Sequence, residues 1–262
     1  MANDDILLRE DRDGAVLLTL NRPKSRNAVS KALADRLKAE LDSVANRKDV
    51  RAVIITGAGS DAFSAGTDLK ERRDLDADGK WDQSSSLRRA CETIWNLPQP
   101  VIAAISGHCL GGGFELACNC DLRIAAENAS FSWPETRLGA YPGGSAGVVF
   151  PRLIGRARAK ELFFTARTVH AAEALELGIV ERVVPNGAHI ETAMALAEEI
   201  AVNSSPLGAA AVKRMVNAGA DMSIGDAAAL NDALRRPLEG THDYQEGIQA
   251  FFEKRRPVWR GE

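Results

Sequence analysis

Three consecutive glycines, at positions 111–113, constrain this chain more than any other feature of its sequence. They follow the apolar segment 101–105, which predicts a buried strand, and precede residues 114–118, which predict the start of a buried helix. Glycines at such a turn leave the backbone uncovered, so a ligand can approach its N–H groups. The first N–H groups of a helix have no internal acceptor and lie at the positive end of the helix dipole. The turn therefore suits a site where negative charge develops.

A second turn has the same plan. The apolar segment 53–55 predicts a short strand, and the chain then runs into a turn that contains Ala65-Gly66-Thr67. Two adjacent parallel strands that end in such turns can aim two backbone N–H groups at one oxygen. That arrangement is an oxyanion hole, in which the loss of one donor typically lowers the rate by about 10²–10³.

Two carboxylates are candidates to act beside these turns. Glu115 follows the triple glycine, and Glu135 follows Trp133-Pro134 and precedes a second Gly/Pro-rich loop, residues 138–144. Each also has a purely structural interpretation. Glu115 would only complement a helix N-terminus, and Glu135 would be a surface residue after a proline. The residues alone leave both interpretations open.

Composition and charge exclude several other classes of protein. The net charge of −3, with 26% charged residues, provides no basic surface for nucleic acid or an anionic membrane. The acidic start, residues 1–5, lacks the pattern of a secretory signal, and no apolar run approaches the roughly 20 residues that span a bilayer. We therefore expect a cytoplasmic protein with no membrane or nucleic-acid partner.

The four cysteines are expected to be reduced and mostly buried thiols, as is usual in a cytoplasmic chain. Cys118 and Cys120 have no second Cys/His pair at the spacing of metal ligands, so no metal site is expected there.

Strand patterns alternate with helix patterns in the first part of the chain and disappear after about residue 187. This order predicts an α/β core followed by a helical C-terminal appendage, and the strand-free, alanine-rich appendage indicates an oligomer. Residues 70–86 are polar and charged and are predicted to be a mobile surface loop. The predicted strands are residues 7–8, 15–20, 53–55, 101–105, 122–125, 130–132 and 179–184, and the predicted helices are residues 30–47, 87–97, 205–220, 223–238 and 243–255.

Residues 57–62 match the pattern G-x-G-x-x-A after a strand, which occurs in dinucleotide-binding proteins. That fingerprint also needs a helix that opens at the turn and a second strand that ends in an acidic residue about 20 positions later. Residues 63–80 show neither feature, so an NAD-dependent oxidoreductase is disfavoured.

Taken together, the motifs resemble those of the enoyl-CoA hydratase/isomerase family, whose architecture is known as the crotonase fold. The similarity runs nearly the length of the chain. Its strongest element is the combination of Ala-Gly-x-Asp with Leu-Gly-Gly-Gly-x-Glu at this spacing. The matching segments are residues 20–23, 27–28, 63–70, 100–105, 107–115, 134–135, 138–139, 142–143 and 253–259.

The resemblance implies a fold and an assembly. It implies a crotonase-like spiral of ββα turns over residues 1–196, which carries the active site, and a helical C-terminal trimerisation region over residues 197–262. It also implies a homotrimer or a dimer of trimers. The implied substrate is a coenzyme A thioester, with no metal and no separate cofactor.

The resemblance also assigns roles by position. It places the oxyanion hole at the backbone N–H groups of Thr67 and Gly112, and the two catalytic carboxylates at Glu115 and Glu135. The residues that it places near coenzyme A are Lys24, Asn27, Ala28, Ala65 and Lys70, together with Phe251 and Lys254, which would reach the coenzyme A of a neighbouring subunit.

The implied activity is that of an enoyl-CoA hydratase, which adds water at Cβ of an α,β-unsaturated thioester. Negative charge then builds on the thioester oxygen, where two amide donors would stabilise it. Glu115 would activate the water and Glu135 would protonate Cα. An enoyl-CoA isomerase, which needs one carboxylate, is an alternative, as is another lyase or a hydrolase on the same fold. A non-catalytic or RNA-binding member is disfavoured by the balanced charge.

The chain departs from the usual hydratase pattern after Pro142-Gly143. The family typically continues with Ala-Gly-Gly-Thr-Gln-Arg, whereas this chain continues with Gly-Ser-Ala-Gly-Val-Val-Phe at residues 144–150. Trp133 and Tyr141 are also predicted to add bulk near Glu135. A bulky or aromatic acyl group is therefore either accommodated or excluded, and the sequence leaves this open.

Overall fold

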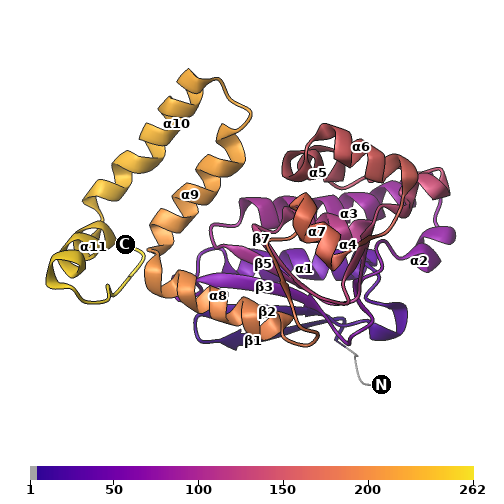
Figure 1. The fold of residues 1–262 in the computed structure, drawn as a ribbon, viewed down its shortest axis with the longest axis horizontal. Coiled ribbons are helices and arrows are strands. Elements are labelled where there is room, and N and C mark those ends of the chain that lie inside the picture. The colour runs from indigo at the N-terminus through magenta and orange to yellow at the C-terminus, as the bar shows by residue number, and fades with distance from the viewer. Residues whose placement is uncertain (1–4) are drawn as a thin grey trace.

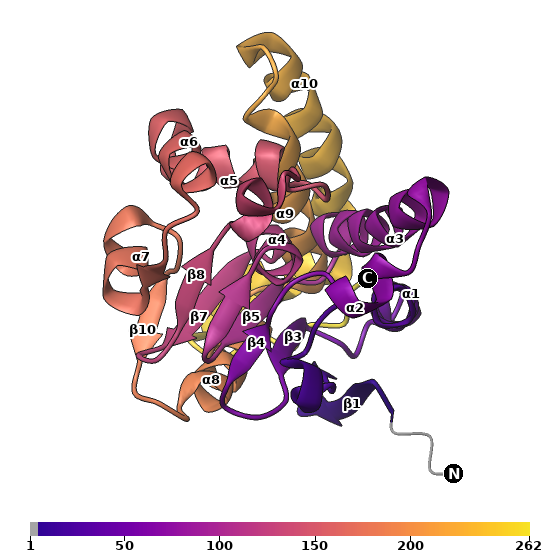
Figure 2. The ribbon, with the colours of Figure 1, turned by 90° about the vertical axis from the view of Figure 1, so that its right-hand side faces the viewer.

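The computed structural model describes residues 5–262, so the first four residues of the acidic start lie outside it. It shows two sheets with helices around them and a group of helices at the C-terminal end (Figures 1 and 2). The six-stranded sheet has the order β1-β2-β3-β5-β7-β10, and the four-stranded sheet has the order β4-β6-β8-β9. The expected α/β class with a helical C-terminal region is confirmed.

The strands of the large sheet are β1 Leu7–Arg12, β2 Ala15–Leu20, β3 Ala52–Gly57, β5 Val101–Ile105, β7 Leu122–Ala126 and β10 Arg182–Val184. Those of the small sheet are β4 Ala62–Ser64, β6 His108–Leu110, β8 Ser130–Ser132 and β9 Val169–His170. The α-helices are α1 Lys31–Val44, α2 Leu69–Arg73, α3 Ala77–Asn96, α4 Gly112–Asn119, α5 Ala146–Ile154, α6 Arg156–Thr165, α7 Ala171–Leu177, α8 His189–Asn203, α9 Pro206–Gly219, α10 Ile224–Arg235 and α11 His242–Glu253. Three 3₁₀ helices complete the chain: η1 Pro23–Ser25, η2 Pro134–Leu138 and η3 Arg236–Gly240.

The inner strands of the large sheet, such as β3 and β5, are buried on both faces. β1 and β2 form the predicted antiparallel hairpin, and the remaining pairs are parallel. Residues of β3 alternate between two cores: Val53 and Ile55 belong to the larger one, and Ile54 belongs to a smaller one that includes Ala193 and Ala197 of α8. Since helices cover both faces, the parallel strands are continuous apolar runs rather than alternating ones.

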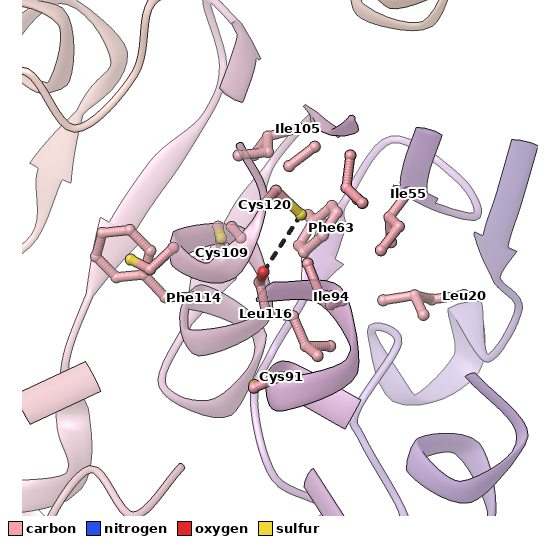
Figure 3. Packing of buried hydrophobic residues seen from close by; sticks show 14 of the residues in the cluster. Leu20, Ile55, Phe63, Cys91, Ile94, Ile105, Cys109, Phe114, Leu116 and Cys120 are labelled. Atoms are coloured by element: carbon pink, nitrogen blue, oxygen red, sulfur yellow. Dashed lines mark hydrogen bonds between the residues drawn. The ribbon is translucent and has the colours of Figure 1, made fainter. Parts of the chain in front are cut away.

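The larger core holds all four cysteines as buried, free thiols, as expected. Figure 3 labels three of them, Cys91, Cys109 and Cys120. The Cys120 thiol donates to the carbonyl of Leu116 at 3.4 Å, one turn earlier in the same segment. Burial raises the pKa of Cys120 to about 12, and these thiols are therefore unreactive packing groups.

One unit, a strand of the large sheet followed by a strand of the small sheet and a helix, occurs three times in succession. The units are β3–β4–α2, β5–β6–α4 and β7–β8–η2. Because β4, β6 and β8 are parallel neighbours, their carboxyl ends lie at one edge of the small sheet. The segments after these three strands begin at Ala65, Gly111 and Trp133, so the topology brings the predicted site residues to that edge.

The prediction of a loop at residues 70–86 is wrong, because this segment forms α2 and most of the first half of α3. The helix predicted from residue 87 begins at Ala77 instead. Side-chain hydrogen bonds stabilise these polar helices. Asp68 accepts from the N–H groups of Lys70 and Glu71 at the start of α2, and Asp76 accepts from that of Gly79 at the start of α3.

The G-x-G-x-x-A segment is not a dinucleotide site. Gly57 ends β3, and the chain continues directly to β4 rather than into a helix. A Cβ on Gly57 would lie 2.5 Å from the carbonyl oxygen of Ala62, so this glycine allows β3 and the β4 backbone to approach closely.

The helices α9, α10 and α11 project away from the sheets (Figure 1). The domain boundary predicted after residue 196 falls inside α8, which is one continuous helix packed on the large sheet, so the projecting region begins after Ser205, the N-cap of α9. Val212 and Val216 on α9 are 63% and 66% exposed in the single chain. Among the described residues, no helix combines the length and the apolar character that crossing a bilayer requires.

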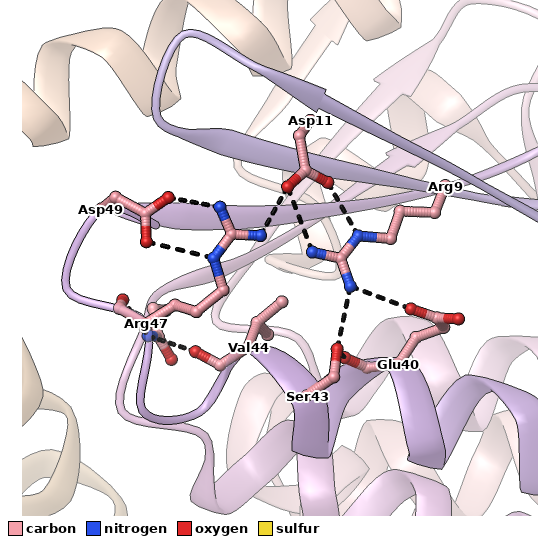
Figure 4. A network of polar contacts seen from close by, with 8 residues as sticks. Arg9, Asp11, Glu40, Ser43, Val44, Arg47 and Asp49 are labelled. Atoms are coloured by element: carbon pink, nitrogen blue, oxygen red, sulfur yellow. Dashed lines mark hydrogen bonds and ion pairs between the residues drawn. The ribbon is translucent and has the colours of Figure 1, made fainter.

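A network of ion pairs joins the edge hairpin to α1 (Figure 4). Arg9 donates to Glu40 at 3.0 Å and to Ser43 at 2.8 Å. Asp11 accepts from Arg9 and Arg47, and hydrogen bonds from these two guanidinium groups lower the pKa of Asp11 to about 2. The charged groups are partly exposed to water, which weakens their attraction, so each pair contributes little to stability.

Candidate active site

The triple glycine leads from β6 into α4, and each of its glycines makes room for a different neighbour. A Cβ on the first would collide with Oε1 of Glu135, one on the second would lie 2.7 Å from Leu87, and one on the third would lie 2.5 Å from Ser64. The first, Gly111, also has a φ of +46°, which disfavours residues that carry a Cβ. Local packing thus requires glycine at residues 111–113.

Two backbone N–H groups meet beside this turn. A Cβ on Gly112 would lie 3.2 Å from the nitrogen of Thr67, and a Cβ on Gly66 would lie 3.3 Å from the nitrogen of Gly112. Gly112 is the first residue of α4, so its N–H has no acceptor within the helix. Thr67 pairs with Val29 through the flanking Gly66 carbonyl and Asp68 N–H, which directs its own N–H away from Val29.

Glu115 lies in the first turn of α4 and is 2% exposed. Its Oε1 accepts from the N–H of Gly144 at 2.7 Å and from that of Ala146 at 3.3 Å. Burial raises the pKa of Glu115 to about 7, opposed by the amide of Gly144 and assisted by the charge of Glu135. The carboxyl group is therefore close to half ionised near neutral pH.

Glu135 lies in the first turn of η2, after β8. Its Oε1 occupies the space that the missing side chain of Gly111 leaves. Its Oε2 is buried and has no hydrogen-bond partner within residues 5–262. Burial also raises the pKa of Glu135, so its proton is held more tightly than on a surface carboxyl.

Both carboxylates face one cavity of about 350 Å³. Glycine-turn residues form one wall, α2 and α3 a second, and η2 with the following loop a third. The cavity is lined by Ala65, Gly66, Thr67, Leu69, Arg72, Arg73, Lys80, Ser84, Leu87, Gly111, Glu115, Pro134, Glu135, Leu138, Ala140, Tyr141, Gly143 and Gly144. A carboxyl with an unsatisfied oxygen, a second carboxyl and two convergent amides thus share one enclosed space, which suits proton transfer next to a developing oxyanion.

The chain matches the family model described as enoyl-CoA hydratase/isomerase over residues 10–262. The chain belongs to the enoyl-CoA hydratase/isomerase family. It is 41% identical to the Bacillus subtilis (strain 168) protein YngF, whose name contains the words enoyl-CoA hydratase/isomerase, over 98% of this chain and 99% of that one. It is 37% identical to the mitochondrial methylglutaconyl-CoA hydratase of Mus musculus, over 97% of this chain and 82% of that one.

Solved structures agree with this assignment. The crystal structure of the enoyl-CoA hydratase from Bacillus anthracis has a TM-score of 0.96 and 40% sequence identity with this chain, and the match covers 98% of this chain and 100% of that one. The spiral of ββα turns that the resemblance implied is therefore confirmed as the crotonase fold.

Lys24, Asn27, Ala28 and Ala65, which the family resemblance placed near coenzyme A, lie on two neighbouring segments. The N–H of Ala65 donates to the carbonyl of Arg26 at 2.8 Å, and Oγ of Ser64 donates to the carbonyl of Asn27 at 2.7 Å. Ala65 lines the cavity, whereas Lys24 and Lys70 are exposed outside it, and Ala28 is half-buried. Asn27 is fully buried, and its side-chain amide donates to the carbonyls of Ala58 and Ala62 while its oxygen accepts from the N–H of Arg22. Its side chain therefore shapes the loop from within rather than presenting a free polar group.

Phe251 and Lys254 lie at the end of α11, in the projecting helical region. Phe251 is 78% exposed, and neither residue lines the cavity of its own chain. Their contact with the coenzyme A of a neighbouring subunit stays a prediction.

Trp133 does not add bulk to the cavity, contrary to the expectation from the sequence. It is 1% exposed and stacks on Phe114 with ring centroids 4.4 Å apart. Only Tyr141, of the two expected aromatic residues, lines the cavity, and its side chain is 72% exposed. Trp133 comes directly after β8. A strand of three residues is too short for its sequence pattern to show which side of the sheet the next side chain faces.

The sequence analysis missed the cavity wall made by α2 and α3, since it interpreted residues 70–86 as a loop. Lys80, Ser84 and Leu87 share one helical face, at i, i+4 and i+7, but only Leu87 is apolar, so the sequence carries no apolar stripe that would have revealed this helix. For metals, the described residues contain no group of three or more His, Cys, Asp or Glu side chains arranged as ligands.

Proposed function

We propose that this protein is an enoyl-CoA hydratase, which adds water across the α,β double bond of an acyl-CoA thioester. One observation supports the proposal: the buried carboxyl group of Glu115 and the half-buried one of Glu135 face the same cavity, beside the neighbouring backbone N–H groups of Thr67 and Gly112. Hydration needs two proton transfers, one from water and one to Cα. Two carboxyl groups can supply both transfers, whereas a single carboxyl group beside an oxyanion hole would suit fewer reactions.

In the proposed mechanism, the thioester oxygen accepts hydrogen bonds from the N–H groups of Thr67 and Gly112. Water attacks Cβ while Glu115 takes a proton from it, and the electrons of the double bond move to the thioester oxygen as an enolate. Glu135 then delivers its proton to Cα, which re-forms the thioester carbonyl. The pKa of Glu115, about 7, matches a base that works near neutral pH, and burial favours the protonated form of Glu135.

The remaining parts of the proposal follow the family. The substrate carries coenzyme A, the reaction uses no metal and no separate cofactor, and the working unit is a homotrimer or a dimer of trimers. The exposed Val212 and Val216 on α9 support an assembly, because such apolar faces are usually covered by a partner.

The test is the conservative replacement of each acid in turn. E115Q and E135Q should each lower kcat for the hydration of a short enoyl-CoA by at least about 10³, followed as the loss of thioester-conjugated absorbance. E92Q is the matched control, because Glu92 is an exposed residue of α3 paired with Arg88. Hydration rates near wild type in both active-site variants would overturn the proposal.

The same variants separate hydration from isomerisation. An isomerase needs only one carboxyl group to move a proton between two carbon atoms, so one of the two variants would retain activity on a 3-enoyl-CoA. A hydratase instead loses most of its activity in both variants.

A further inference from the structure

One wall of the active-site cavity carries cations that hydration does not require. Arg72, Arg73 and Lys80 line the cavity together with Ser84 and Leu87. Lys80, Ser84 and Leu87 form a stripe along α3 that changes from charged to apolar. Leu87 is beside Gly112, whereas Lys80 is seven residues earlier, about 10 Å away along the helix axis. The cavity is therefore apolar next to the oxyanion hole and positively charged at its other end.

The Arg72 guanidinium is only partly satisfied by its own chain. Its Nη1 donates to the carbonyl of Lys80 at 3.1 Å, to Oε1 of Gln83 at 3.1 Å and to Oγ of Ser84 at 3.2 Å. These bonds fix the group over the first turns of α3. Its Nε and Nη2 make no hydrogen bond to any other group of residues 5–262, so the part of the fork that binds carboxylates in pairs remains open.

No carboxylate of the described chain forms an ion pair with Arg72 or Lys80 within 4.0 Å. Arg73 differs, because it is exposed and paired with Asp74 at 3.0 Å. Neither acid of the cavity pairs with these cations. Glu115 binds the amides of Gly144 and Ala146, and Oε2 of Glu135 has no hydrogen-bond partner among residues 5–262.

A half-buried cation without an anionic partner is unfavourable, and a guanidinium fork matches the geometry of a carboxylate better than that of a neutral group. We infer that the cavity takes an α,β-unsaturated acyl-CoA whose acyl chain ends in a carboxylate, which Arg72 binds with the help of Lys80. The inference rests on the proposed function, because that function places the thioester at the Leu87 end of the stripe.

The first experiment measures binding, not turnover. Glutaryl-CoA carries the terminal carboxylate, and 5-methylhexanoyl-CoA has an isopropyl group of similar shape in its place; both are saturated and unreactive. Calorimetry should show that the wild type binds glutaryl-CoA at least about tenfold more tightly. R72M should weaken glutaryl-CoA binding by about 10- to 100-fold and leave the uncharged analogue within about twofold.

Three further variants sharpen the result. R72K should fall between wild type and R72M, because it keeps the charge but loses the fork. K80M should reduce the same preference without altering the hydrogen bonds that Arg72 makes to α3. R88M is the matched control, and its preference should equal that of the wild type because Arg88 is a partly exposed residue of α3 that is paired with Glu92 and does not line the cavity.

Three outcomes would overturn the inference. The first is a wild type with no preference between the thioesters. The second is an equal loss of affinity for both thioesters and for free coenzyme A in R72M and K80M, which would assign these cations to the phosphates. The third is a retained preference in both variants, which would remove Arg72 and Lys80 from the site.

Kinetics then separate the inference from the proposed function. The wild type should hydrate glutaconyl-CoA with a higher kcat/KM than 5-methyl-2-hexenoyl-CoA. Preferential binding of glutaryl-CoA without hydration of either enoyl thioester would reject the hydratase and keep the carboxylate site. Equal hydration of both, with equal binding, would keep the hydratase and reject the carboxylate site.

Discussion

The two acids of the cavity stand on walls of opposite character. Glu115 belongs to α4, whose residues are all buried, and its Oε1 is held by two backbone N–H groups. Glu135 belongs to η2, which is followed by a loop with exposed side chains, and its Oε2 has no partner among residues 5–262. One acid is fixed by the core, whereas the other is positioned by a surface segment.

This difference indicates how the work of the site is divided. The wall of Glu115 and the amides of Thr67 and Gly112 is organised before substrate arrives, which is what stabilisation of a developing charge requires. The wall of Glu135 leaves one oxygen unsatisfied, so substrate or water completes its hydrogen bonding. Changes to the first wall, or to Glu135 itself, should therefore affect the chemical step, and changes to the other residues of the second wall should affect which acyl group fits.

Apart from replacement of the two acids themselves, the largest expected effect comes from G111A. The added Cβ would collide with Oε1 of Glu135, and a φ of +46° is unfavourable for alanine. Displacement of Glu135 together with the neighbouring amide of Gly112 should lower kcat/KM by about 10²–10³.

G178A is the control for G111A, because Gly178 also has a positive φ, +77°, at the end of α7, and the nearest atom to its Cβ position is 3.8 Å away. It should lose a similar amount of stability, about 1–2 kcal/mol, with hydration within about threefold of wild type. Equal activity losses in the two variants would show that backbone strain, and not the contact with Glu135, controls the rate.

The next prediction concerns how the stability of the protein depends on pH through Glu115. The pKa of Glu115 is raised from an ordinary value of 4.5 to about 7 in the folded protein. Its contribution to stability is therefore fully present below about pH 4.5 and is lost as the pH rises through about 7. Glutamine cannot ionise, so the free energy of unfolding of E115Q should increase relative to wild type by up to about 3 kcal/mol between pH 4.5 and pH 8.

Urea unfolding at pH 5 and pH 8 measures this difference, with E92Q as the control that should follow the wild type at both values. A difference between E115Q and wild type that is the same at both pH values would mean that burial does not perturb Glu115 in solution.

The smallest effect is expected at the wall formed by η2 and the loop that follows it. Tyr141 lines the cavity but is 72% exposed, so Y141A should change KM for different acyl chains by about three- to tenfold. The kcat for the best substrate should stay within about threefold of wild type. A hundredfold loss of kcat would show that this wall is as strictly organised as the one that carries Glu115.

The turn that forms the wall of Glu115 was predictable from the sequence. The triple glycine follows a recognisable apolar strand, so periodicity and turn chemistry predicted the turn into α4. The assignment of Glu115 as a catalytic acid came from the family resemblance and stays a prediction. The parallel order of β4, β6 and β8 then placed Thr67, Gly111 and Glu135 at one edge, in agreement with the expectation of two converging turns.

The α2–α3 wall could not be predicted in the same way. Its helices are stabilised by capping carboxylates and by Gln83, which is buried and donates to Glu71 and to the carbonyl of Asp68. Such interactions leave no apolar stripe over residues 70–86, so a charged helix was interpreted as a loop. The prediction of a loop therefore missed the cations that line the cavity. The acyl preference that we infer from them rests on the structure.

The contact between Gly111 and Glu135 has a consequence for how this scaffold can change. Gly111 has no side chain, and the carboxyl group of Glu135, from η2, occupies the space where a side chain would be. Replacing Glu135 by a smaller residue would empty this space without disturbing α4 or the amides of Thr67 and Gly112. The same protein could then polarise a thioester while a different group, or a water molecule, occupies the vacated space, so new acyl-CoA chemistry can arise by exchanging a single residue of a surface segment.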